Sequence, residues 1–558
     1  MLVGGLMLIQ ALTLAWTAAV KAPVFDEVSH LPAGISHWKF GRFELYRVNP
    51  PLIRMLATVP LLIVEPDIDW SGAPDGPFEK PEVTYGKRFL KANGDDAFRC
   101  FTYARWALIP VALLGGWICY CWSNELFGPP CGLIALALWS LCPTVLGWGA
   151  TITPDVGAAT FGVAACYAFW RWLDSPRWGR AFACGVALGL AELAKSTWII
   201  LFALWPIIWL AWRICSTRQQ PAIPPATQLA FQLILGLYIL NAGYGFEGTF
   251  QPLGQYRFIS QSLSGLARTE FPGNRFSGTL AARIPIPLPV NYVLGIDAQK
   301  RDFEDGKSSY LRGEHKLGGW YHYYVYAMAV KTTLGTECLL LMAVCLMLSS
   351  VKYRREFSSE IALLLPAVAV LVLVSSQTGF NRYVRYVLPA LPFLFIVASR
   401  VGRLFERRKI LPALSLFCVT ATAVESLSVA PHSMSFFNML AGGPRGGHAH
   451  LLDANIDWGQ DLLELKRLID RRPDIATIKL VYFGFVDPKL AGIEFTPLAA
   501  GRTREGLVEP GWYAISAHYL YDDTKLNPGH ADVSWFRQLK PDAMAGYSIY
   551  LFHVSPVD

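Results

Sequence analysis

The chain has 558 residues, of which 53% are hydrophobic and only 16% are charged, and its mean hydropathy is +0.33. Soluble domains ordinarily carry about 25% charged residues, so this composition excludes an ordinary soluble protein and predicts one solvated largely by lipid. The net charge of +7 does not indicate nucleic acid as a partner, because the basic residues of membrane proteins collect in cytoplasmic loops.

Apolar runs that are long enough, or nearly long enough, to cross a bilayer predict about eleven transmembrane helices. The first, at 2–20, lacks the basic start and cleavage site of a signal peptide, so we expect it to be retained. The division of 180–213 into two spans is not fixed by the sequence. The predicted spans are 2–20, 101–122, 131–148, 155–172, 180–195, 197–213, 228–246, 333–350, 360–375, 384–399 and 410–430.

Basic residues on alternate connections predict the orientation of these spans, because such residues favour the cytoplasmic side. With those connections inside, the N-terminus is also inside, and two large loops, 21–100 and 247–332, lie outside with the tail that begins at 431. The residues that set this orientation are Arg171, Arg177, Arg180, Arg213, Arg218, Lys352, Arg354, Arg355, Arg403, Arg407, Arg408 and Lys409.

The tail differs in character from the rest of the chain. Asp461 to Ile469 has a helical pattern of leucines, and the runs 478–483, 512–520 and 547–554 are rich in β-branched and aromatic residues, as strands are. We therefore predict a transmembrane domain over 1–430 and a small extracytoplasmic α/β domain over 431–558.

Two adjacent carboxylates, Asp26 and Glu27, directly follow the first predicted span. One interpretation is that they only cap a surface helix. The other is that a partly desolvated carboxylate at the membrane boundary takes a proton from an acceptor hydroxyl or amine. The two interpretations can hold for different members of the pair.

Three further charged residues lie at or inside later spans. Asp155 follows Pro154 at the start of the fourth span, which is also an ordinary helix-start signal. Glu192 and Lys195 lie three residues apart on one face of an apolar run, where they can neutralise each other and fix helix packing. Alternatively, Lys195 binds a lipid-linked phosphate near the outer end of its span.

The loop 247–332 ends in a run of aromatic residues that includes Trp320. An interfacial aromatic belt explains most of these side chains, and stacking on a sugar ring is the alternative. Glu314, His315 and His322 are metal-ligating residue types without a recognised ligand spacing. A divalent metal is therefore left open, and no other cofactor is indicated.

A last candidate group stands at the outer end of the tenth span, where Arg382, Arg385 and Tyr386 follow one another closely. Arginine makes bidentate contacts with phosphate, and interfacial anchoring is the competing interpretation.

Several short motifs follow one another along the chain: Asp26-Glu27, Asn49-Pro50-Pro51-Leu52, Thr153-Pro154-Asp155, Leu193-Ala194-Lys195-Ser196-Thr197, Gly319 to Thr332, Arg385-Tyr386-Val387-Leu388-Pro389 and, in the tail, Asp453 to Leu462. In this order they resemble those of the GT-C superfamily, the phospholipid-carrier-dependent glycosyltransferases, and in particular bacterial relatives of the protein O-mannosyltransferases and aminoarabinose transferases. The sequence departs from that pattern at Thr333, where relatives commonly have proline, and at His322, where a second aromatic residue is usual.

The resemblance implies a GT-C type helical membrane protein in the bacterial cytoplasmic membrane. It implies a hexosyl- or pentosyltransferase that moves a sugar, with inversion, from a polyprenyl-phosphate donor to a protein, lipid or glycan acceptor on the extracytoplasmic face. It nominates Asp26, with Glu27 beside it, for catalysis. The residues expected to bind the donor phosphate or the acceptor are Asp155, Lys195, Arg382, Arg385, Tyr386, Glu314, His315 and Trp320.

Two other classes of function compete with this one. A multi-span transporter or flippase also needs many helices and a few buried charges, but the sequence shows no internal repeat and has large outer segments. In the second, the tail is a recognition domain for an envelope partner and the membrane part is mainly its anchor.

Overall fold

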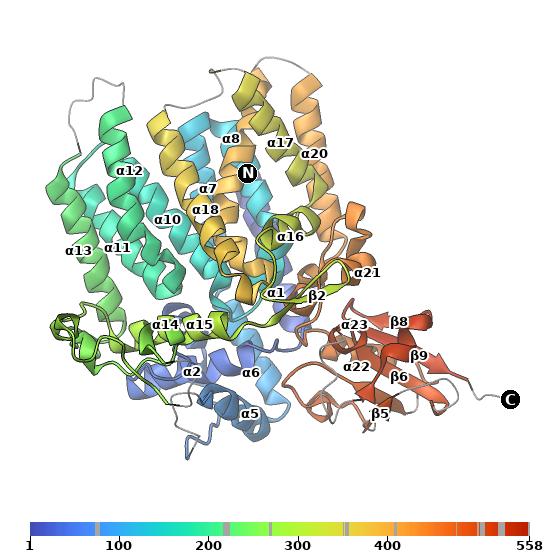
Figure 1. The fold of residues 1–558 in the computed structure, drawn as a ribbon. Helices are drawn as coiled ribbons and strands as arrows, with labels where there is room; N and C mark the ends of the chain where they lie inside the picture. Colours follow the sequence, from blue (N-terminus) through green and yellow to red (C-terminus); the bar gives the residue numbers. More distant parts are fainter. Residues whose placement is uncertain are drawn as a thin grey trace.

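Helices dominate the computed structural model, which describes residues 1–555 except 73–78, 216–223, 267–270, 350, 352–356, 407–409, 476, 499–500, 503–507 and 523–530. Long helices pack side by side into a bundle, and shorter helices, loops and a sheet gather at one end of it (Figure 1). The bundle consists of α1 (Leu2–Val20), α6 (Asp96–Trp106), α7 (Ile109–Phe127), α8 (Pro129–Ser140), α9 (Pro143–Gly149), α10 (Pro154–Asp174), α11 (Trp178–Ala194), α12 (Leu201–Cys215), α13 (Ala226–Gly243), α16 (Tyr323–Lys331), α17 (Leu334–Ser349), α18 (Phe357–Ser376), α19 (Leu391–Ala398) and α20 (Ile410–Leu427).

Six helices of the described part are long and apolar enough to cross a membrane, and the number rises to eight if each of two bent pairs forms one span. The chain is therefore a multi-pass membrane protein, but the expected number of about eleven spans is not reached by length and composition alone. In the uncertain region 180–213, α11 has only 17 residues and ends at Ala194, and the next span covers Ser196–Ile214. Seven of the basic residues that set the predicted orientation lie outside the described residues: Arg218, Lys352, Arg354, Arg355, Arg407, Arg408 and Lys409.

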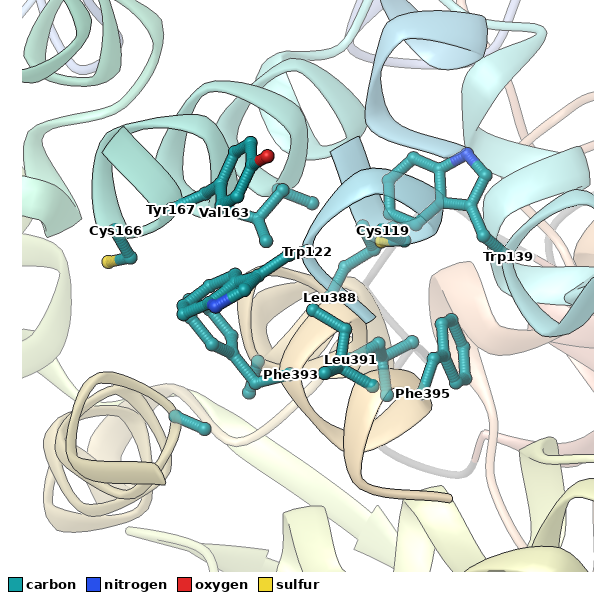
Figure 2. Close-up of a cluster of buried hydrophobic side chains, with 14 of the residues drawn as sticks. Cys119, Trp122, Trp139, Val163, Cys166, Tyr167, Leu388, Leu391, Phe393 and Phe395 are labelled. Atoms are coloured by element: carbon teal, nitrogen blue, oxygen red, sulfur yellow. The ribbon is translucent and has the colours of Figure 1, made fainter. Parts of the chain in front are cut away.

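Large aromatic side chains fill the centre of the bundle. Trp122 of α7, Trp139 of α8 and Phe393 of α19 lie in one buried cluster with Tyr167 of α10 (Figure 2). Helix α10 also approaches the Trp198 ring so closely that a Cβ on Gly162 would lie 1.8 Å from it. Interiors packed this tightly allow little movement, so the packing holds the first turn of α10 and the segment before α19 in fixed relative positions.

The two predicted outer loops lie at the same end of the bundle (Figure 1). The first loop folds into α2 (Glu27–Phe40), α3 (Leu52–Thr58), α4 (Leu61–Val64) and α5 (Pro81–Asn93), and the second contains α14 (Gln261–Ser264), α15 (Val290–Asp305) and the hairpin β1 (Ser308–Leu311) and β2 (Glu314–Leu317).

The tail forms a five-stranded sheet in the order β4-β3-β6-β9-β8, which confirms the expected small α/β region. The strands are β3 (Ile478–Val481), β4 (Phe495–Pro497), β6 (Gly511–Ser516), β8 (Ala543–Ala545) and β9 (Ile549–Val554), with α22 (Leu462–Asp470) before them. Strand β3 pairs in parallel with β4 and β6. The strand expected at 512–520 stops at Ser516, which lies opposite Ile549, the first residue of β9, and the chain continues as α23 (Ala517–Tyr521).

The sheet does not fold around a separate core. Val28 and Phe89 of the first loop belong to the same buried cluster as Ile478 and Leu551 of the sheet. Burial of a large apolar side chain contributes about 1.5–3 kcal/mol, so the first loop and the tail stabilise each other.

Asp457, a buried tail residue, makes the stability of this region depend on pH. Its carboxylate accepts hydrogen bonds from the backbone N–H groups of Gly459 (3.1 Å) and His518 (3.4 Å), yet burial raises its pKa to about 7. An unfolded aspartate titrates near pH 3.9, so between these values the folded state holds one more proton than the unfolded state. Stability must then fall as pH rises.

We therefore expect wild type to lose stability relative to Asp457→Asn between about pH 5 and pH 7, by about 1.4 kcal/mol for each pH unit. Thermal unfolding of both proteins at several pH values measures this difference. Parallel pH profiles of the two proteins would contradict the proposed titration of Asp457.

Candidate active site

The first candidate, Asp26, stands at the N-cap of α2 but makes no capping hydrogen bond with its side chain. Instead, Oδ2 lies 2.5 Å from Nη2 of Arg385. The side chain remains 16% exposed, and Oδ1 has no hydrogen-bond partner among the described residues. Asp26 therefore has one anchored oxygen and one that faces outward.

Asp155 and Lys195 lie beside this pair. Asp155 is in the first turn of α10, which begins at Pro154, and its Oδ1 lies 2.6 Å from the Lys195 Nζ. Its Oδ2 lies 3.7 Å from Nη1 of Arg385. The four residues Asp26, Arg385, Asp155 and Lys195 thus form a continuous series of alternating charges, which we call the ion-pair chain. It joins residues from four separate parts of the sequence.

The ion pair expected as one alternative between Glu192 and Lys195 is absent. Helix α11 ends at Ala194, and Lys195 has extended backbone angles of φ −159° and ψ 130°, so its side chain leaves the helix face that carries Glu192. Glu192 instead accepts a hydrogen bond of 2.6 Å from the Tyr292 hydroxyl. Lys195 is therefore available to the ion-pair chain.

Aromatic rings surround Arg385 and Lys195, the two cations of the ion-pair chain. The Arg385 guanidinium lies 4.5 Å from the Trp148 ring centroid and 4.8 Å from that of Tyr383, and the Lys195 ammonium lies 5.0 Å from the Tyr386 ring. Such rings attract cations and exclude water. Within the described part of the chain, the buried Nε of Arg385 has no partner, so the guanidinium keeps a donor for a further group.

Glu27, the second member of the acidic pair, has a different environment. It is completely buried and binds Arg105 through both oxygens, at 2.8 and 2.6 Å. It also accepts hydrogen bonds of 2.8 Å from the backbone N–H groups of Val24 and Ile152. A carboxylate with four donors has little capacity left for a substrate, so this geometry favours a structural role for Glu27.

A cavity of about 1070 Å³ opens between the two outer loops, lined by residues between Ser36 and Tyr85 and between Glu247 and Asp305. Tyr46 lies in the wall of the cavity and also contacts helix α2, which begins beside Asp26. The Tyr46 ring packs against His30, with ring centroids 4.5 Å apart. Burial, together with the nearby charge of Asp26, raises the pKa of the Tyr46 phenol. Through Tyr46, the wall of the cavity therefore contacts helix α2, whose N-cap is Asp26.

The other predicted residues lie elsewhere. Arg382 forms an ion pair with Asp453 of the tail rather than joining the ion-pair chain. Glu314 is exposed in β2, and His315 lies 3.6 Å from Asp522. The backbone N–H of Trp320 donates to the Asn381 side chain. Of the eight predicted binding residues, the structure thus brings Asp155, Lys195, Arg385 and Tyr386 together with Asp26.

No group of three or more His, Cys, Asp or Glu side chains in the described residues is arranged to hold a metal ion. Glu314 and His315 lie in the hairpin, whereas His322 is exposed at the N-cap of α16.

Sequence reasoning missed three residues that shape this site. Arg105, the partner of Glu27, is a charge inside the predicted span 101–122, and that position alone was a signal. Trp148 ends another predicted span and gives no local sign that it will lie against Arg385. Tyr46 carries a φ of +58°, which indicates a constrained loop position but is invisible in the sequence.

Comparisons with known proteins bear on the class of this site. Residues 101–235 match the model of a family described as dolichyl-phosphate-mannose-protein mannosyltransferase. The match covers the chain from α6 into α13 and, over that segment, confirms the resemblance to mannosyltransferases. A comparison with curated proteins found no match.

Solved structures matched by this chain include ArnT from Cupriavidus metallidurans bound to undecaprenyl phosphate, with 12% identity and a TM-score of 0.46 over 98% of this chain and 96% of that one. They also include the archaeal oligosaccharyltransferase AglB from Archaeoglobus fulgidus in complex with an inhibitory peptide and a dolichol-phosphate. The corresponding values are 13% identity and a TM-score of 0.43, over 76% of this chain and 55% of that one.

Proposed function

We propose that this chain, whose residues 101–235 match the mannosyltransferase family model, is a membrane glycosyltransferase that takes its sugar from a polyprenyl-phosphate donor. One observation carries the proposal. The ion-pair chain places a partly exposed carboxylate and two cations together at the end of the bundle where the outer loops gather. A transfer from a lipid phosphate needs a base for the acceptor and positive charge for the leaving group.

The reaction is a single displacement with inversion. The acceptor oxygen or nitrogen attacks the anomeric carbon of the donor sugar and forms the new glycosidic bond, while the bond from that carbon to the phosphate oxygen breaks. Asp26 takes the acceptor proton, and the phosphate keeps the bonding electron pair. Arg385 and Lys195 stabilise the negative charge that develops on the phosphate.

The two reactants reach this point from different directions. The acceptor occupies the cavity between the outer loops, whose wall includes Tyr46, and the carrier tail stays in the bilayer. The sugar is a hexose or pentose, and the acceptor is a protein, lipid or glycan. We place the reaction on the extracytoplasmic face of the bacterial cytoplasmic membrane, with the N-terminus inside, as the basic connections indicate.

Removal of the Lys195 amine should weaken carrier binding. A hydrogen bond to a charged group contributes about 1.5–3 kcal/mol, so we expect Lys195→Met to bind polyprenyl phosphate about 10- to 100-fold more weakly than wild type, with Lys195→Arg close to wild type. Titration of the purified proteins with polyprenyl phosphate, followed by tryptophan fluorescence, measures both constants. Equal affinity of Lys195→Met and wild type would remove Lys195 from the phosphate site.

Mass analysis of membranes and envelope fractions from cells with and without the gene tests the activity itself. We expect one sugar to disappear from one class of molecule when the gene is deleted, and to return with the wild-type gene but not with Asp26→Asn. A transporter or flippase would instead move a substrate into sealed vesicles while the purified protein forms no glycosylated product, and that outcome would overturn the proposal.

A further inference from the structure

The tail segment Asp453–Asp461 is far from most of the ion-pair chain in sequence but packs beside it in the structure. It lies after the last bundle helix and before the sheet, and every one of its residues is buried. We call this segment the tail motif. Its backbone and side-chain groups form hydrogen bonds with the loop that carries Asp26 and with the loop that carries Arg385.

Asn455 of the tail motif holds the loop before Arg385. Its Oδ1 accepts a hydrogen bond of 3.0 Å from the backbone N–H of Val384, and its Nδ2 donates one of 2.8 Å to the carbonyl of Arg382. The same Nδ2 lies within reach of the Tyr323 hydroxyl and the Leu452 carbonyl. A fully bonded buried amide of this kind has one orientation, and it fixes the backbone immediately before Arg385.

The other end of the tail motif holds the loop before Asp26. The Trp458 carbonyl accepts a hydrogen bond of 3.0 Å from Phe25, and the Gln460 carbonyl accepts one of 3.0 Å from Ala22. The Trp458 ring lies between the two loops, with its centroid 5.2 Å from the Phe25 ring and 5.1 Å from the Tyr383 ring.

We infer that the tail motif is a clamp that sets the separation of Asp26 and Arg385, with Asn455 as a positioning residue for Arg385. Asp26 and Arg385 are 359 residues apart in sequence. Each follows directly after a stretch of backbone that is hydrogen-bonded to the tail motif. The inference rests on the proposed function, because the separation of Asp26 and Arg385 affects the rate only if both residues act in sugar transfer. A misplacement of about 1 Å at a reacting group can cost about 100-fold in rate.

Asn438 offers a matched control. It is also a buried asparagine of the tail, and its Nδ2 donates to the carbonyls of Ala329 (2.7 Å) and Thr332 (3.0 Å). Its Oδ1 accepts a hydrogen bond from Ala441. It therefore loses a similar set of hydrogen bonds on substitution but touches neither of the clamped loops.

The experiment compares Asn455→Ala and Asn438→Ala in the full-length protein. We expect Asn455→Ala to lower kcat for transfer about 100-fold with little change in the acceptor KM, and Asn438→Ala to keep kcat near wild type at a comparable Tm. Wild-type kcat in Asn455→Ala, or an equal loss in both variants, would overturn the inference.

Hydrogen exchange supplies a readout that does not need activity. Peptides covering 22–26 and 382–386 should exchange faster in Asn455→Ala than in wild type, and at the wild-type rate in Asn438→Ala. Unchanged exchange in Asn455→Ala would contradict the clamp even if the enzyme is active. Faster exchange in a protein whose wild type transfers no sugar would instead leave the clamp standing and contradict the proposed function.

If Asn455→Ala does not fold, Trp458 provides the second test, because its substitution keeps the backbone hydrogen bonds. The Trp458 indole Nε1 has no partner among the described residues, so Trp458→Phe should retain kcat within about threefold. Trp458→Ala should lower kcat by about tenfold or more, because it removes the ring that contacts both Phe25 and Tyr383. Equal rates for these two variants would count against the clamp.

Discussion

Asp26→Asn should abolish sugar transfer while the protein stays folded. The substitution keeps the size of the side chain but removes the base, and general base catalysis contributes about 10²- to 10⁴-fold to a rate. Asparagine keeps an oxygen that can accept a hydrogen bond from Arg385, and Arg385 retains Asp155 as a countercharge, so the protein should stay folded. Initial rates of polyprenyl phosphate release, measured on purified protein beside its Tm, give both quantities.

The matched control for this variant is Asp95→Asn, an exposed aspartate at the N-cap of α6. It changes the charge of the same loop by the same amount and should keep the wild-type rate. Full activity in Asp26→Asn would exclude Asp26 as the base, and an equal loss in Asp95→Asn would assign the effect to the charge of the loop.

Arg105→Met should produce the largest loss of stability among single substitutions near the site. The Arg105 guanidinium bonds to Glu27 and to the carbonyls of Ala18, Lys21 and Ala22. Methionine fills similar space but leaves the buried Glu27 carboxylate without its countercharge. Removal of one partner of a buried ion pair costs about 3–5 kcal/mol, and the loop that carries Asp26 loses its anchor.

Arg99→Met on the same helix provides the comparison for Arg105→Met. Arg99 pairs with Asp96 at the surface, where the two side chains are 75% and 76% exposed, so its loss should change Tm little. Thermal unfolding in one detergent compares the two variants. If Arg105→Met unfolds at the temperature of Arg99→Met, the buried pair does not stabilise the fold as we describe.

Asp26, Asp155, Lys195 and Arg385 each lie at the end of an apolar run, so the sequence predicted that all four are on one side of the membrane. The ends of membrane spans must alternate between two faces, so an assignment of sides from the basic loops limits which charged residues can meet. These inferences need only local composition and the thickness of a bilayer.

Contacts that join distant parts of the chain could not be obtained in this way. Glu27 and Asp26 are neighbours of the same chemical type, and only the approach of Arg105 from α6 separates their environments. Likewise, Arg382 and Arg385 are equivalent in sequence, yet the η6 turn at Val384–Ala390 directs one to Asp453 and the other to Asp26. Tertiary packing determines the different environments within each of these pairs, because the local sequence pattern is the same for both residues of a pair.

The strand pairing of the tail was also beyond sequence reasoning. The runs that became β3, β6 and β9 were identified from their β-branched and aromatic residues, but the parallel pairing of β3 with β6 depends on contacts across the sheet. The tail motif is one of the segments that resemble the GT-C superfamily, but its sequence does not show that Asn455 bonds to residues 382–384.

The most direct measurement of the central claim is a cryo-electron microscopy map of the protein in a lipid nanodisc with polyprenyl phosphate. We expect the phosphate within hydrogen-bond distance, about 3 Å, of the Lys195 Nζ and the Arg385 guanidinium, with Asp26 facing the cavity beside it. A phosphate bound elsewhere, with the ion-pair chain unchanged and closed to it, would contradict the assignment of this site to sugar transfer.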